Sequence, residues 1–270
     1  MNVLLTNDDG IQALGLGAMR RALLDVPGVD LAVIAPDGNR SASGRSITTR
    51  TPLSVTEVHF GDGTVGYATD GTPVDCVRFA ALGLVEKEPD LIVSGINHGA
   101  NLGDDITYSG TVAAALEGIV LGIPAIAVSQ QSRRGEMDFR LGDRFDFEQA
   151  AGFAARIVEE LEDVPMPEST LLNINCPAGD AAGARTCRLG KRIYRDRLEL
   201  TEEKDGRRVY RIYGDDPGYH EEEGTDFAAI ADGHIAVTPL HFDLNDAAGM
   251  EALDGFDLDR LLRPAASEVE

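Results

Sequence analysis

The amino-acid sequence predicts an α/β fold: a Rossmann-like, doubly wound and mostly parallel sheet, followed by a C-terminal strand-rich extension. Over the first 180 of the 270 residues, short apolar runs alternate with helix-like segments. This alternation is typical of parallel sheets with helices on both faces. After about residue 180 the alternation ends and the chain becomes highly charged, which indicates a segment outside the core.

The first part of the chain is expected to fold as strand, helix, strand, hairpin and helix. Glycine, proline and small polar residues mark the boundaries, because they favour turns over regular structure. Pro36 closes the second strand, the hairpin turns at residues 61–63, and Thr72 can cap the second helix. The predicted elements are strand 3–6, helix 14–24, strand 30–35, loop 36–51, hairpin 54–68 and helix 73–84.

Residues 90–175 are expected to add three strands and two helices. A buried strand leads into a loop with three glycines, and Ser109 begins a helix of small residues. The predicted elements are strand 90–94, loop 95–108, helix 111–121, strand 125–129, helix 147–162 and strand 171–175.

The C-terminal third departs from this pattern. Segment 185–224 is rich in charge and poor in apolar runs, so we expect paired strands that project from the core. A last strand over 234–238, closed by Pro239, should return to the core, and the acidic tail from Asp243 should be held loosely. The chain therefore divides into a Rossmann-like catalytic core, 1–180, an extension, 181–233, and a final segment, 234–270.

The composition excludes several classes of protein. No run of about 18 apolar residues occurs and the N-terminus lacks a basic segment, so we expect neither a membrane span nor a signal peptide. Cys76, Cys176 and Cys187 lack metal-type spacing, and we expect reduced thiols in a cytoplasmic protein.

The net charge is unusually negative. The chain carries 46 acidic and 24 basic residues, a formal charge of −22, so its bulk surface is not expected to bind nucleic acid polymers. Two interpretations remain: an ordinary acidic protein, or a halophilic one. We favour the second, because self-repulsion of this size needs the screening that a salt-rich cytoplasm provides.

Asp8 and Asp9 follow the first predicted strand directly. In open α/β sheets, ligands bind beyond the carboxyl ends of the strands. Two adjacent carboxylates repel each other unless a cation neutralises them, and oxygen ligands suit Mg²⁺ or Mn²⁺. The alternative is a solvated turn, since Asn and Asp are common there.

Two further loops follow buried strands and are rich in oxygen and nitrogen donors. In the first, Ser41 offers a hydroxyl to a metal or phosphate, and Arg40 and Arg45 could pair with phosphate oxygens. In the second, Asn97 supplies a neutral oxygen ligand, and His98 could act as a general acid. The alternatives are a flexible surface loop and a polar surface histidine.

The helix that begins near Ser109 favours an anion. Its free N–H groups and positive dipole end attract negative charge, and Ser109 and Thr111 add hydroxyl groups. Ser109 could equally be a plain N-cap.

Five stretches of the sequence form a recognisable series: LLTNDDG, APDGNRSASGRSIT, GTPVDCV, SGINHGANLGDDITYSGTVAAALEG and TDFAAIADGHIAVTPL. With these motifs in this order, the chain resembles the survival protein SurE family of 5'/3'-nucleotidases. The resemblance spans most of residues 1–130 and one block near the end, and segment 185–224 matches weakly. Ala42 and Ala100 stand where the family more often has glycine and proline.

The resemblance implies a divalent-metal-dependent phosphomonoesterase that hydrolyses nucleoside 5'- and 3'-monophosphates. One Mg²⁺ or Mn²⁺ per subunit would be the cofactor. The metal ligands would be Asp8, Asp9, Ser41 and Asn97, the catalytic residues Asp8 and Asp9, and the residues near the substrate phosphate Asn39, Ser109, Gly110 and Thr111.

The resemblance also implies that the extension reaches across to a partner subunit. It would then be an oligomerisation arm of a homodimer or homotetramer. The alternative is a lid over the site of a single subunit.

Two rival functions are compatible with the residues. One is a metal-dependent nucleotide-binding module without turnover. The other is a Rossmann-type reductase, although residues 10–17 lack the G-x-G-x-x-G spacing that follows the first strand of such enzymes. The chain also lacks a G-x-S-x-G elbow and a G-x-x-x-x-G-K-[ST] phosphate loop.

Overall fold

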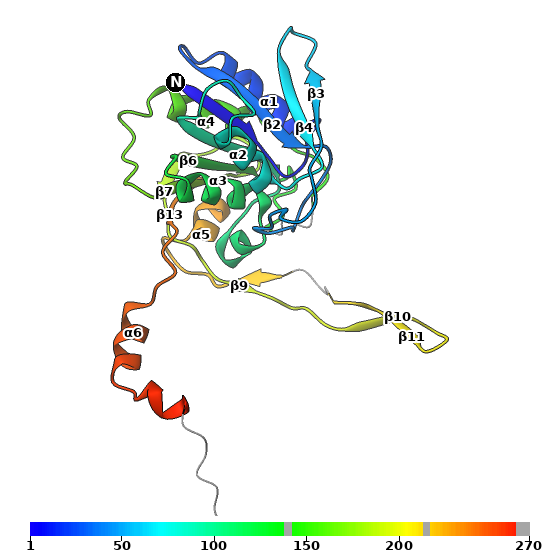
Figure 1. Ribbon diagram of the computed structural model, residues 1–270, viewed down its shortest axis with the longest axis vertical. Helices are drawn as coiled ribbons and strands as arrows, with labels where there is room; N and C mark the ends of the chain where they lie inside the picture. Colours follow the sequence, from blue (N-terminus) through cyan, green and yellow to red (C-terminus); the bar gives the residue numbers. More distant parts are fainter. Residues whose placement is uncertain (138–141, 213–216, 263–270) are drawn as a thin grey trace, which may run out of the picture.

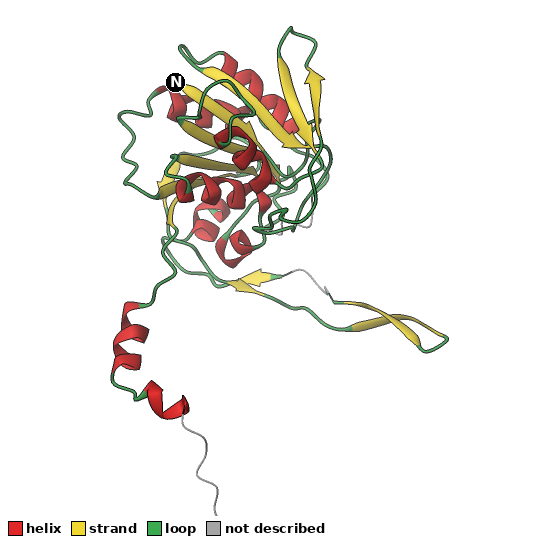
Figure 2. Cartoon of the chain, viewed as in Figure 1, coloured by secondary structure: helices red, strands yellow, loops and turns green. Residues whose placement is uncertain are grey.

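The main chain forms a nine-stranded sheet with helices packed on both of its faces (Figures 1 and 2). The computed structural model describes residues 1–137, 142–212 and 217–262; residues 213–216 of the predicted extension and 263–270 of the predicted tail lie outside the described residues. The strand order is β3-β4-β2-β1-β5-β6-β7-β13-β8. This arrangement confirms the predicted α/β, Rossmann-like fold with a mostly parallel sheet.

The core elements follow the predicted order. They are β1 Asn2–Thr6, α1 Leu14–Leu24, β2 Asp30–Pro36, β3 Val55–His59, β4 Val65–Thr69, α2 Pro73–Ala81, β5 Leu91–His98, the 3-10 helix η1 Gly103–Thr107, α3 Gly110–Val120, β6 Ala125–Gln130, α4 Glu148–Glu159 and β7 Thr170–Cys176.

The C-terminal elements are shorter and partly separate from the sheet. They are β8 Ala184–Thr186, β9 Arg192–Ile193, β10 Glu199–Lys204, β11 Arg207–Arg211, β12 Gly218–Tyr219, α5 Asp226–Ala231, β13 Ile235–His241, α6 Ala247–Asp254 and the 3-10 helix η2 Leu258–Leu262.

The strand order places a switch point in the middle of the sheet. From β1 the chain moves outward through β2 to β4, and then returns to add β5, β6 and β7 on the other side of β1. All neighbouring pairs from β4 to β7 are parallel. The carboxyl ends of β1 and β5 therefore lie side by side where the direction reverses, which is where open α/β sheets bind ligands.

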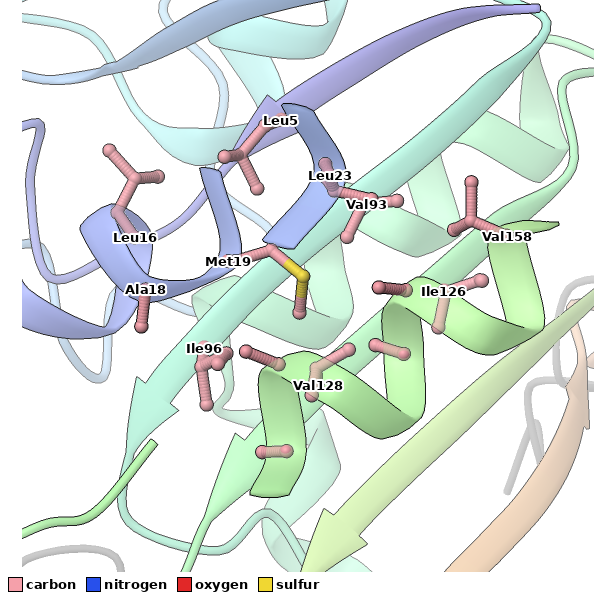
Figure 3. Close-up of a cluster of buried hydrophobic side chains, with 14 of the residues drawn as sticks. Leu5, Leu16, Ala18, Met19, Leu23, Val93, Ile96, Ile126, Val128 and Val158 are labelled. Carbon is pink, nitrogen blue, oxygen red and sulfur yellow. The ribbon is translucent and has the colours of Figure 1, made fainter. Parts of the chain in front are cut away.

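Apolar side chains cover both faces of the sheet. Helices α1 and α4 pack on one face, and α2 and α3 pack on the other. Figure 3 shows Met19 of α1 among Val93, Ile126 and Val128 of the sheet and Val158 of α4. Because the central strands are covered on both sides, they read as continuous apolar runs rather than alternating ones.

Strand β5 is longer than predicted, and the predicted loop from Gly95 begins too early. The strand continues to His98, with an irregular register between Ser94 and Asn97. Gly95 has φ +133°, a conformation that glycine adopts without a steric penalty. It therefore marks a bulge inside the strand rather than its end.

Three other boundaries differ from the prediction by three residues, and the remaining differences are smaller. Helices α2 and α4 end at Ala81 and Glu159, before the predicted ends at residues 84 and 162. Strand β13 runs on through Pro239 to His241, although proline was expected to close it. The flanking strand β8 pairs with β13 only as far as Val237, so Pro239 lies where β13 is the edge of the sheet. Edge positions tolerate proline, which has no N–H to donate to a second neighbouring strand.

The charged segment forms the expected paired strands. Strands β10 and β11 make an antiparallel hairpin that projects away from the sheet (Figure 1). Helix α6 and η2 extend from the end of β13 with no buried residue. Among the described helices, none is long and apolar enough to cross a membrane.

Candidate active site

Asp8 and Asp9 lie in the turn that follows β1. The Asn7 side chain closes this turn, since its Nδ2 donates to Gly10 O at 3.1 Å and its Oδ1 accepts from Gly10 N at 3.2 Å. Arg40 N also donates to Asp8 O at 2.7 Å, which joins the turn to the loop after β2. The two aspartates thus stand at the carboxyl edge of the sheet beside the switch point.

The Asp8 carboxylate is buried against the start of α3. It accepts a hydrogen bond from the Thr111 hydroxyl, and its side chain packs on Gly110. A Cβ atom at Gly110 would lie 2.7 Å from Asp8 Cβ, so glycine is needed for this approach. Burial, and then the charge of Asp9, raise the pKa of Asp8 to about 6.

The Asp9 carboxylate faces the end of β5. Its Oδ2 accepts from His98 N at 3.1 Å, its Oδ1 accepts from Asn39 Nδ2 at 3.4 Å, and His98 Nδ1 lies 3.6 Å from Oδ1. Burial raises the pKa of Asp9 to about 6. Two adjacent buried carboxylates therefore resist ionisation together in the absence of a neighbouring cation.

A cavity of about 30 Å³ lies between the carboxyl ends of β1, β2 and β5 and the start of α3. It has room for an ion or a water molecule. Four predicted site residues line it, one from each of four segments: Asp8, Ser41, Asn97 and Ser109. Asp9 and Asn39 join the same cluster, because Asn39 Oδ1 accepts from Ser41 N at 2.8 Å. The structure thus brings all the predicted ligand positions to one edge of the sheet.

The donor set suits a hard divalent cation. Asn97 Nδ2 donates to Gly99 O at 2.8 Å, which leaves Asn97 Oδ1 as the group able to bind a cation. Two carboxylates, one amide oxygen and one hydroxyl match the ligands that Mg²⁺ and Mn²⁺ take. In the part of the chain that the structure describes, no three His, Cys, Asp or Glu side chains form a metal-type cluster; this set depends on two neutral oxygens instead.

The residues expected near phosphate also support the site itself. Ser109 Oγ accepts from Val112 N at 3.1 Å and so caps α3, while Thr111 and Gly110 hold Asp8. Both interpretations of Ser109 are compatible with this, since it is an N-cap that also lines the cavity. The positive end of α3 points to the same place and favours an anion there.

Comparison with known proteins agrees with the geometry. The sequence model of the family described as "Survival protein SurE" matches residues 3–196. The chain belongs to this family. It is 52% identical to the 5'-nucleotidase SurE of Rubrobacter xylanophilus over 267 residues, which cover 97% of this chain and 99% of that protein. It is 45% identical to the 5'-nucleotidase SurE of Chloroflexus aggregans over 258 residues, covering 94% and 98%.

A solved structure of the SurE family has the same fold. The crystal structure of the SurE protein from Aquifex aeolicus matches with a TM-score of 0.77 and 38% sequence identity. The match covers 97% of this chain and 100% of that one.

Two arginines that could pair with phosphate oxygens have carboxylate partners within the chain. Arg40 pairs with Asp37 at 2.6 Å, and Arg45 pairs at 2.8 Å with Glu117, which is 1% exposed. Neither lines the cavity. The loop sequence alone does not show these partners, because Glu117 lies 72 residues from Arg45 along the chain.

The structure adds residues to the SurE site that the sequence interpretation did not select. Asn101, Asp105 and Tyr108 line the same cavity. Asn101 O accepts from the Asn173 and Asn175 amides at 3.0 and 2.9 Å, which fixes the loop after β5. The only sequence signal for them was their place in the glycine-rich loop.

His98 is partly buried rather than a free surface residue. Its ring stacks on Phe145 and Phe147 at centroid distances of 5.2 and 5.0 Å, and its buried Nε2 has no hydrogen-bond partner. Burial lowers the pKa of His98, which favours the neutral form of its ring. In this geometry His98 orients Asp9.

A larger cavity of about 800 Å³ lies beside α1 and α4, and none of the predicted ligands lines it. The candidate active site is therefore selected by the chemistry of its side chains and not by its volume. A stretch with the spacing G-x-G-x-x-G does occur at residues 61–66, but it spans the β3–β4 turn and the start of β4 instead of following β1. That position does not provide the strand-to-helix phosphate site of a reductase.

Proposed function

We propose that this chain is a divalent-metal-dependent nucleotidase that hydrolyses nucleoside 5'- and 3'-monophosphates to nucleoside and phosphate. The buried pair Asp8 and Asp9, beside the start of α3 and in one cluster with Ser41 and Asn97, is the observation that carries this proposal. Relatives named 5'-nucleotidase SurE support the substrate class.

Asp8, Asp9, Ser41 and Asn97 would hold one Mg²⁺ or Mn²⁺ per subunit. When bound, the cation polarises a phosphoryl oxygen and lowers the pKa of a coordinated water. Hydrogen bonds from Thr111, His98 N–H and the Asn39 amide keep the two carboxylates in place. Preorganised ligands of this kind avoid a reorganisation cost during the reaction.

The start of α3 would bind the substrate phosphate. Ser109 lies at the cavity, and the helix dipole stabilises negative charge on the anion. Asn39 contacts Ser41, and Gly110 and Thr111 contact Asp8, so all three lie next to residues that line the cavity. The positive end of the α3 dipole would stabilise the negative charge that develops on the phosphoryl oxygens in the transition state.

The proposal is tested by measuring phosphate released from AMP with Mn²⁺, before and after EDTA. Metal-dependent, reversible release is expected. Binding of nucleotide and metal with no release would replace the proposal with a binding module. Tight binding of NAD(P)H in a fluorescence titration would favour a reductase.

We also propose a cytoplasmic, salt-adapted homodimer or homotetramer. Residues 1–180 would be its catalytic core, 181–233 its oligomerisation arm and 234–270 its returning strand and tail. The exposed apolar side chains of the hairpin and of α6, and the charge of −22, support this assignment.

A further inference from the structure

Tyr108 stands at the mouth of the metal cavity. It lines the cavity, precedes Ser109 directly and keeps 52% of its surface exposed. Its main chain is held from two sides, since Tyr108 N donates to Asp105 O at 2.9 Å and Tyr108 O accepts from Gly44 N at 3.1 Å. The ring is thus carried on a fixed backbone with an open face.

Tyr194, from the base of the arm, is a second tyrosine beside this cavity and contacts one of the residues that line it. Its hydroxyl donates to Asp105 Oδ1 at 3.0 Å, and Asp105 lines the same cavity. Tyr194 nevertheless keeps 46% of its surface exposed. Burial, the charge of Asp105, the hydrogen bond to it and the nearby Tyr108 phenol raise the pKa of Tyr194, so its hydroxyl remains a donor.

A buried ion pair fixes the Tyr194 anchor. Arg192 Nε donates to Asp105 Oδ2 at 2.7 Å, and Arg192 Nη2 donates to Met137 O at 2.7 Å. The Arg192 side chain is 0% exposed and stacks on Phe227 at 4.6 Å. The Asp105 carboxylate is therefore held in one orientation, because Oδ2 accepts from Arg192 and Oδ1 accepts from Tyr194.

Tyr108 and Tyr194 are both partly exposed and held by hydrogen bonds, and exposed aromatic rings bind planar ligands by stacking. Nucleobases stack on tyrosine with little preference among bases, because every base has a π face. Little side-chain entropy is lost at such a site, since the tyrosine side chain has only two rotatable angles. A phosphate at Ser109 would place the attached nucleoside beside the residue that precedes it, Tyr108.

We propose that Tyr108 and Tyr194 bind the nucleobase of the substrate by stacking. The enzyme then prefers nucleotides to phosphomonoesters without a base, and it discriminates weakly between purines and pyrimidines. This inference rests on the proposed nucleotidase function and assigns its substrate-recognition surface, to which the arm contributes one tyrosine.

The test compares kcat/KM for AMP with that for ribose 5-phosphate, which lacks the base, at saturating Mn²⁺. Tyr108→Ala and Tyr194→Ala are each expected to lower the AMP to ribose 5-phosphate ratio about 10-fold, mainly through KM for AMP. Tyr108→Phe, which keeps the ring, should retain the ratio. The matched control is Tyr210→Ala, since Tyr210 is 42% exposed on β11 and away from the cavity.

The outcomes separate the two proposals. Wild-type protein that releases phosphate from neither compound overturns the nucleotidase function and this inference with it. Release from both compounds at equal kcat/KM, or a ratio unchanged in both alanine variants, overturns the stacking inference alone. If Tyr108→Ala does not fold, Tyr108→Leu removes the π face with less change in volume, and the same loss of ratio is expected.

Discussion

At the scale of single residues, the site depends on two carboxylates that are costly to ionise without a cation. Asp8 and Asp9 are buried, adjacent and held by donors from α3, β5 and the loop after β2. In the proposed function, this burial keeps a place in the fold where a divalent cation would be the favoured neutralising group.

Removing either carboxylate is expected to abolish metal-dependent turnover. Asp8→Asn and Asp9→Asn keep shape but remove charge from the donor set, so kcat/KM for AMP should fall by ~10²-fold or more. Phosphate release at saturating Mn²⁺ measures this, with the circular dichroism spectrum as a check on folding. The control Asp30→Asn alters an exposed carboxylate paired with Lys87 and should leave turnover unchanged. Near-wild-type turnover in either site variant would reject the assignment.

Proton competition should make Mn²⁺ binding depend on pH. The pKa of each aspartate is raised to about 6, so in the metal-free protein protons occupy these groups as the pH falls below about 6. Cation binding needs the ionised forms, so Mn²⁺ affinity should fall by up to ~10-fold per pH unit for each proton displaced. Calorimetric titration with Mn²⁺ from pH 5 to pH 8 measures this. An affinity independent of pH over that range would contradict it.

At the scale of elements, one buried ion-pair cluster fastens the Ser41 loop to the core. Glu117 of α3 is 1% exposed and pairs with Arg45 of the loop at 2.8 Å and with Arg78 of α2 at 2.6 Å. Further along, Thr48 N donates to Asp75 at 3.0 Å. Ser41 is therefore presented to the cavity by a loop whose anchors lie on two helices of one face of the sheet.

Breaking this cluster should loosen the loop and weaken metal binding. Glu117→Gln leaves two arginines without their buried partner. The free energy of unfolding should fall by about 1–3 kcal/mol. This is less than the loss on breaking a fully buried ion pair, because both arginines are partly exposed. The expected result is a lower Tm and weaker Mn²⁺ binding. Arg188→Gln is the control, because it breaks an exposed pair with Glu222 and should change neither. A Tm and an affinity equal to wild type would show that Glu117 does not anchor the loop.

At the scale of the whole molecule, exposed apolar side chains gather on the segments that extend from the core. Leu198, Leu200, Tyr210 and Ile212 of the hairpin region are exposed, and α6 and η2 add further exposed apolar side chains. Apolar side chains gathered on an exposed surface are typical of subunit interfaces.

We therefore expect a homodimer or homotetramer that depends on the arm. Light scattering at working salt should give two or four times the subunit mass of 28.8 kDa. Replacing residues 199–211 with a short glycine linker should lower that mass, because it removes the hairpin. A monomer mass for the intact chain would reject the assembly.

Salt should stabilise the protein. The charge of −22 repels itself in dilute buffer, where the Debye length is ~30 Å at 0.01 M, and molar salt shortens it to ~3 Å. Exposed pairs such as Arg133–Asp146 weaken in salt, but acidic residues outnumber basic ones by 46 to 24, so relief of repulsion should dominate. Tm measured from 0.01 M to molar KCl should rise. A flat or falling series would reject salt adaptation and leave the nucleotidase proposal intact.

The sequence by itself determined the alternation of strands and helices, the turn that carries Asp8 and Asp9, and the cap at Ser109. These features follow from local periodicity, turn chemistry and the spacing of glycine and proline, which act over a few residues. The order of predicted elements then brought the strand-end residues to one edge, because parallel strands share their carboxyl side.

Only the tertiary structure decided which distant side chains meet at that edge. Thr111 reaches Asp8 across 103 residues of sequence, and Tyr194 reaches Asp105 across 89. The continuation of β5 past Gly95 and of β13 through Pro239 depended on neighbouring strands, not on the residues themselves. Such contacts are set by strand order and packing, which local sequence does not encode. For that reason the sequence predicted that the candidate ligands would lie at the strand ends, but not which side chains support them.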